Sequence, residues 1–148
     1  MKPQKNLTVV EGSVLLEEDV ERAFKAAGIP VDAALQFLNP HRASNNPWAK
    51  FLGPPRLLAD ATAHAAQALS RQQPLANGRK PRLVVMNALG AGKSREVTPF
   101  ITRLFIDYSN VGKTYEDHNA VDAEIEGNCE ENVVWTLALA VGDRKSVV

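Results

Sequence analysis

The stretch Val133-Val-Trp-Thr-Leu-Ala-Leu-Ala-Val141 is almost continuously apolar, and it decides which fold the sequence predicts. Nine residues suit a β-strand and are far too few to span a bilayer. A strand that is apolar at successive positions is typical of one covered on both faces. We therefore expect this stretch to be the central strand of the sheet, and we expect no association with a membrane.

The residues before this strand predict an antiparallel neighbour. Asp122, Glu124 and Glu126 alternate with Ala123 and Ile125, as in a half-exposed strand. Residues 127–132 would then join the two strands as a hairpin. Two more strands are expected, a short one at 7–10 and a buried one at 82–86.

Apolar residues at helical spacing predict four helices. The expected ranges are 16–27, which Gly28 and Pro30 end, 31–38, 56–72, and a helix opened by Thr98 and Pro99. The last of these has an apolar stripe, which we expect to face the sheet; it includes Phe100, Ile101, Leu104 and Phe105.

This inventory predicts an α+β fold in which N-terminal helices pack with a mixed, mainly antiparallel sheet of about four strands; an α/β fold is the alternative. The 148 residues, 45% of them hydrophobic, suit a single globular domain over 1–148. A single cysteine, Cys129, excludes an intrachain disulfide framework. No targeting segment is recognisable, so a cytoplasmic protein is expected.

The zero net charge conceals a segregation along the chain. Residues 40–95 contain nine basic side chains and one acidic, whereas residues 96–143 contain two basic and ten acidic. The two segments could neutralise each other within one molecule, meet between copies, or expose a basic surface to nucleic acid. Nucleic acid is the least favoured, because the acidic segment would repel phosphate. The leading hypothesis is a non-enzymatic assembly module without a cofactor, which self-associates or binds a protein partner.

The alternative function is binding of a small anionic ligand, a phosphate or a nucleotide, by the protein itself or by an enzyme that acts on such a ligand. A glycine-rich segment between an expected strand and an expected helix would hold it, through Gly90, Gly92, Lys93 and Ser94. The full phosphate-loop spacing is absent, because Asn87 occupies the leading glycine position.

Two further groups of residues are candidates for a site. A long loop at 39–55 contains His41, Arg42 and Trp48, which could contact an anion or a partner. Asp122, Glu124 and Glu126 would share one face of the expected strand, where their oxygens could hold a divalent cation.

Overall fold

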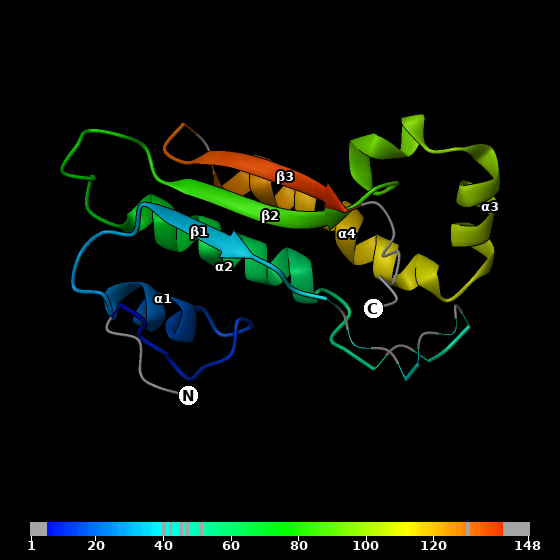
Figure 1. The fold of residues 1–148 in the computed structure, drawn as a ribbon, viewed down its shortest axis with the longest axis horizontal. Coiled ribbons are helices and arrows are strands. Elements are labelled where there is room, and N and C mark those ends of the chain that lie inside the picture. The colour runs from blue at the N-terminus through cyan, green and yellow to red at the C-terminus, as the bar shows by residue number, and fades with distance from the viewer. Residues whose placement is uncertain are drawn as a thin grey trace.

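The computed structural model describes residues 6–39, 41, 43, 44, 46, 48–50, 52–129 and 131–140. These residues form three strands and four α-helices, which follow one another in sequence (Figure 1). Their bounds are α1 (Glu17–Lys25), β1 (Ala33–Gln36), α2 (Leu57–Arg71), β2 (Arg82–Ala88), a 3-10 helix η1 (Gly92–Val97), α3 (Phe100–Tyr108), α4 (Val111–Asn128) and β3 (Val134–Ala140).

The strands form one sheet in the order β1-β2-β3, and both pairs are parallel. The fold is therefore α/β, and the expectation of a mainly antiparallel α+β sheet is wrong. The apolar stretch at 133–141 is also misplaced by the sequence argument. Residues 134–140 form β3, which has β2 as its one neighbour among the described strands and therefore lies at an edge of the sheet, while β2 is the central strand.

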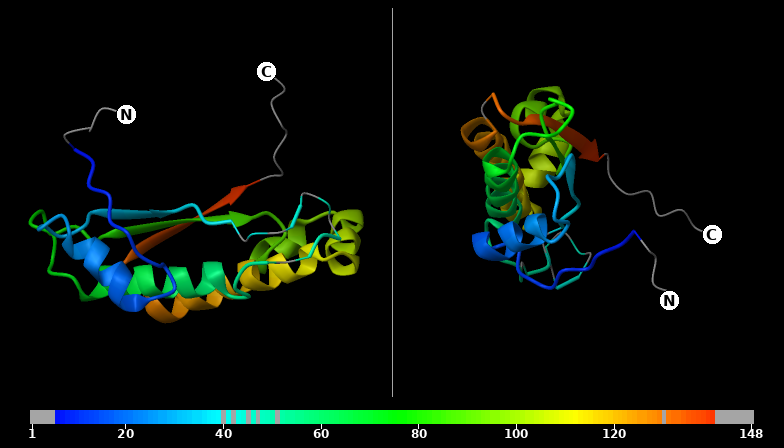
Figure 2. Two further views of the ribbon diagram at one scale, coloured as in Figure 1. Left: turned by 90° about the horizontal axis from the view of Figure 1, so that it is seen from below. Right: turned by 90° about the vertical axis from the view of Figure 1, so that its left-hand side faces the viewer.

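One face of the sheet carries the core. Figure 2 shows α1, α2 and α4 gathered on the same side of the strands. Leu83 and Val85 of β2 point to this side and are fully buried, and buried and half-buried residues alternate from Leu83 to Ala88. The core forms where they meet the two long helices; its largest members are Leu58, Leu69, Leu83, Val85, Val121 and Ile125.

The opposite face of the sheet has no helix against it among the described residues (Figure 2). Leu35 is 65% exposed and Val134 is 46% exposed, while Val84 and Met86 between them are half-buried. Parallel sheets are ordinarily covered on both faces, so this open apolar face is a notable feature of the structure.

Among the elements predicted for residues 7–86, three are confirmed and two are wrong. The helices expected at 16–27 and 56–72 are α1 and α2, and the strand expected at 82–86 is β2. Residues 7–10 form no strand, and the helix expected over 31–38 is replaced by β1. A segment of eight residues satisfies helical and strand spacing about equally, and pairing with β2 decides for the strand.

The strand expected over 122–126 and its hairpin are also wrong, because 111–128 form the helix α4. The buried residues of α4 are Asp117, His118, Val121 and Ile125, which have helical spacing. Two of the four are polar, so hydrophobic periodicity did not reveal the helix. The polar residues are buried because each has a hydrogen-bonding partner in the interior.

The helix expected after Thr98 and Pro99 is confirmed as α3, but its apolar stripe does not face the sheet. Phe100 is 74% exposed and Ile101 is 79% exposed. Figure 1 shows α3 beyond the end of the strands, not over their face. Thr98 does not cap the helix, since its hydroxyl donates to the Ser94 carbonyl. None of the helices in the described ranges is long and apolar enough to cross a membrane.

A single carboxylate joins the two long helices. The first backbone N–H groups of α2 have no side-chain cap from Arg56, which precedes the helix. Asp117 of α4 supplies it instead: its oxygens accept the N–H groups of Leu58 at 2.8 Å and Ala59 at 2.9 Å. Asp117 is 1% exposed. This buried negative charge at the positive end of α2 satisfies its free donors and stabilises the helix dipole.

We expect Asp117→Asn to lower the free energy of unfolding by about 1–3 kcal/mol, because an amide offers one acceptor oxygen where two are needed. Urea unfolding followed by circular dichroism measures the change. Asp60→Asn is the matched control. Asp60 lies in the first turn of α2, the turn that Asp117 caps, but its carboxylate pairs with Arg56 at the surface. Its cost should stay below about 0.5 kcal/mol. Equal losses in the two variants would contradict the role of Asp117.

Candidate functional site at the carboxyl end of the sheet

The loops that follow β1 and β2 leave the sheet at its carboxyl end, where ligands bind in open α/β folds. Residues 89–99 lead from β2 to α3, and the described part of 37–56 leads from β1 to α2 (Figure 1). Most of the residues that the sequence singled out lie in these loops or on α4 beside them. The carboxyl end is therefore the part of the molecule to test for a site.

The glycine-rich segment folds back on itself. Gly90 N–H donates to Ser94 Oγ at 2.9 Å, and Gly92 N–H donates to Asn119 Oδ1 at 2.7 Å. Ser94 N–H donates to the Ala91 carbonyl at 3.1 Å. The backbone donors that a phosphate would need thus have acceptors in the chain. Phosphate binding here stays a prediction that these contacts do not favour; the Lys93 side chain lies outside the described part.

Two of the three predicted metal-ligating carboxylates lie beside this loop. On a helix, residues i and i+4 share a face but i+2 does not, so Asp122 and Glu126 line one cavity together. Glu124 points elsewhere and binds Arg56 at 2.6 Å. In the described residues, no group of three His, Cys, Asp or Glu side chains could hold a metal ion. The structure therefore separates the proposed ligand set.

The loop packs tightly on Asp122 at Gly92. Gly92 has a φ of +51°, and a Cβ there would collide with the Asp122 carboxylate. We expect Gly92→Ala to lower the free energy of unfolding by about 2–4 kcal/mol, from the left-handed backbone and the collision together. Gly78→Ala is the control for backbone strain alone, since Gly78 has a φ of +68° and open space around it. It should cost about 1–2 kcal/mol. Equal losses in thermal or urea unfolding would contradict the close packing.

A buried histidine lies below the loop, where β2 ends. His118 is 8% exposed, and its Nδ1 lies 2.5 Å from Oδ1 of Asn87, a residue that is 2% exposed. The amide nitrogen of Asn87 donates to the His118 carbonyl at 3.2 Å, which fixes the amide orientation. Because Asn87 Oδ1 can only accept, Nδ1 carries the proton and Nε2 has the lone pair in the neutral ring. No described residue is bonded to that Nε2.

The surroundings keep this histidine neutral. Burial lowers the pKa of His118 below its ordinary value, and the neighbouring Asp117 carboxylate opposes that shift only in part. Tyr115 lies one helical turn away, with its ring edge-on to the imidazole at 6.0 Å between centroids. Its hydroxyl donates to the Leu89 carbonyl at 2.9 Å, and burial raises its pKa. Perturbed titratable groups gathered at one point are typical of functional sites.

A cavity of about 220 Å³ adjoins this pair. It lies between β3 and α4, and Asn87 belongs both to its wall and to the histidine pair. The rest of the wall is mostly apolar, with two carboxylates and a hydroxyl; its other lining residues are Ala91, Ser94, Asp122, Ile125, Glu126, Trp135, Leu137 and Leu139. None of the described lining residues is basic.

The depressed pKa of His118 predicts a stability that depends on pH. When the pH falls through about 6.5, unfolded His118 takes up a proton that the folded protein still refuses. The free energy of unfolding should therefore decrease between pH 7.5 and pH 5.5, and His118→Asn should show a smaller decrease. Urea unfolding at the two pH values measures this. A decrease in His118→Asn that equals the decrease in the wild type would contradict the assignment.

The long loop after β1 is tied to the same end of the sheet. Asn110 donates a side-chain N–H to the Trp48 carbonyl at 2.8 Å, so the loop lies beside the start of α4. Trp48 is 63% exposed and His41 is exposed as well. The structure does not gather them into the cavity wall, and the prediction for Arg42 falls outside the described residues.

The charge segregation is partly neutralised inside the molecule. Arg56 and Arg95, from the basic segment, bind Glu124 and Asp107 of the acidic segment at 2.6 and 2.8 Å. Arg71 pairs instead with two carboxylates of α1. These contacts match the first of the three interpretations, neutralisation within one molecule. Pairing of charges between copies is not needed to account for them.

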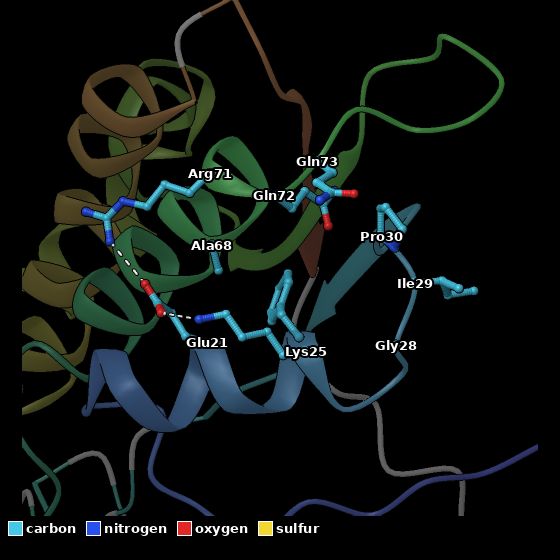
Figure 3. Close-up of a pocket in the computed structure, with 10 residues that line it drawn as sticks. Glu21, Lys25, Gly28, Ile29, Pro30, Ala68, Arg71, Gln72 and Gln73 are labelled. Carbon is cyan, nitrogen blue, oxygen red and sulfur yellow. Dashed lines mark hydrogen bonds and ion pairs between the residues drawn. The ribbon is translucent and has the colours of Figure 1, made fainter.

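A larger cavity, about 450 Å³, lies between α1 and the end of α2, away from the carboxyl end (Figure 3). Figure 3 shows Glu21 placed between Arg71 and Lys25, and both basic groups bind it. Gln72 donates to the Val31 carbonyl and accepts its N–H, each at 2.8 Å, which holds α2 against the start of β1. These polar side chains serve the packing of α1, so this cavity is the weaker candidate.

Sequence reasoning missed the pairing of His118 with Asn87. In the sequence, Asn87 is notable only because it breaks the phosphate-loop spacing, and no pattern links it to His118, 31 positions later. The single cysteine is remote from this pair, because the helix places His118 and Cys129 about 16 Å apart along its axis. Cys129 is 1% exposed, and burial raises its pKa.

Comparison with protein-family models, with curated proteins and with solved structures found no match to this chain.

Proposed function

We propose that the protein binds a small molecule in the cavity between β3 and α4, which reaches the carboxyl end of the parallel sheet at Asn87. The observation that carries the proposal is Asn87, which lines the cavity and also fixes the neutral, buried His118. A cavity that joins apolar walls to a few oriented polar groups is the usual form of a small-molecule site. The cavity extends along the helix-facing side of β3, from Trp135 near the start of the strand to Leu139 near its carboxyl end, where Asn87 lies.

The size and lining of the cavity define the class of ligand. An engineered apolar cavity of about 150 Å³ holds benzene, so 220 Å³ suits a single substituted ring or a short branched chain. Trp135, Leu137 and Leu139 supply the apolar wall, which favours a ligand with an apolar ring or chain.

Three probes that share one ring test this proposal. Benzyl alcohol, benzylamine and benzoate carry the same ring with a neutral, a cationic and an anionic substituent. We expect the ring to shift the amide NMR signals of Ala91, Ile125 and Leu137 at millimolar concentration. Comparison of the three substituents then measures which charge the site accepts. The absence of shifts with all three probes would overturn the site.

A variant that fills the cavity shows whether the probes bind inside it. Ala91 lines the cavity and is 3% exposed, so Ala91→Leu should occupy the space and weaken probe binding at least tenfold. Ala123→Leu is the matched control, because Ala123 lies on the exposed side of α4. It should bind the probes as the wild type does. Unchanged affinity in a folded Ala91→Leu variant would show that the probes bind elsewhere.

A further inference from the structure

The outer edge of β3 has no partner strand among the described residues. β3 pairs with β2 on one side, and no described element lies beyond its other side (Figure 1). Val134 N–H donates to the Pro81 carbonyl of the neighbouring chain segment at 2.9 Å. The backbone N–H and C=O groups of successive residues point to opposite edges of a strand. Since those of Val134 point toward β2, the groups of Trp135, Leu137 and Leu139 point outward.

This edge lacks the features that ordinarily prevent strands from pairing. Native edge strands are short, bulged, or interrupted by charge or proline. The seven residues of β3 contain no charge and no proline, and their register with β2 is unbroken from Val134 to Ala140. Trp135 and Leu139 are each 42% exposed. The other edge strand, β1, has only four residues.

We propose that two copies of this chain join through their β3 strands, which pair antiparallel about a two-fold axis at Leu137. The occupant of the edge is thus a second copy. Each outward-facing residue then meets an outward-facing residue, so every pair exchanges both N–H···O=C bonds. Leu137 lies opposite its own equivalent, and Trp135 lies opposite Leu139 of the second copy. The result is a continuous sheet with six strands.

The sequence of β3 is self-complementary in this register. Aromatic and aliphatic residues in direct opposition across strands stabilise a sheet, and the two-fold axis creates such a pair twice. No like charges oppose each other in β3, and the chain carries no net charge that would keep the copies apart.

The pairing also completes the cavity beside β3. The side chains of Trp135, Leu137 and Leu139 all line it, and two of the three are partly exposed at the edge. The second copy would bring its own Trp135 and Leu139 against this opening. Association goes beyond the proposed ligand site and does not rest on it, because the backbone edge pairs whether or not the cavity is filled.

Sedimentation velocity between about 1 and 200 µM tests the association. We expect the mass of the chain to double as the concentration rises. Leu139→Pro should abolish the dimer, because it removes an outward N–H while keeping the ladder to β2. Leu35→Lys on the open sheet face and Ile101→Lys on α3 are controls that should leave the dimer intact. A wild type that is monomeric throughout, or a dimer lost in either control and kept in Leu139→Pro, would overturn the proposal.

Hydrogen exchange of the wild type provides a test that needs no variant. In the dimer, the amides of Trp135, Leu137 and Leu139 should be protected from exchange. Their exchange rates should rise at least tenfold when dilution separates the two copies. The amides of Val134, Thr136 and Ala138 face β2 and should stay protected. A monomer that retains a co-purified peptide on this edge, seen as extra mass in a native spectrum, would assign the edge to a peptide and overturn pairing of two copies. Neither measurement depends on binding of the benzyl probes.

Discussion

The arrangement of this protein depends on one buried charge. Asp117 lies in the middle of α4 and accepts N–H groups from the first turn of α2, including that of Leu58, which lies 59 residues earlier in the chain. A buried carboxylate is tolerated only where donors replace water, and a helix start has free donors to offer. Each of these groups would be costly alone. Together they fix the axial position of α4 against α2, and both helices support the same face of the sheet.

The same contact determines where His118 lies. Because His118 follows Asp117 on the helix, holding one residue at the start of α2 rotates the other toward the end of β2. There it meets Asn87, whose amide is fixed by the His118 carbonyl and by Ala88. The neutral ring at the carboxyl end is thus a consequence of the packing of the helices. A change at Asp117 would therefore disturb the orientation of the imidazole as well as the stability of α2.

The sequence predicted those elements whose signal is local. The helix α1 ends at Lys25, two residues before the expected end at 27, and Gly28, with a φ of +68°, lies in the turn that follows. The alanine-rich pattern of α2 is confirmed. Prediction from the sequence failed where an element is determined by contacts with residues that are distant in the chain. Val133 to Val141 was predicted to be central because it is apolar on both faces, yet β3 is an edge strand with exposed residues. Nor could spacing find α4 or its site, since Asp117 and His118 are buried through contacts with residues 58 and 31 positions away in the sequence.

An apolar run at an edge strand has a physical explanation of its own in this structure. The side chains of Trp135, Leu137 and Leu139 line the cavity beside α4, and their backbone N–H and C=O groups point away from β2, where no described strand pairs with them. The same three residues therefore serve the proposed ligand site through one set of atoms and the proposed pairing through another. Two binding events that share residues are coupled, and the coupling is reciprocal. If the second copy orders these side chains, a ligand in the cavity would find its wall already in place, and the ligand would in turn favour the paired form by the same free energy.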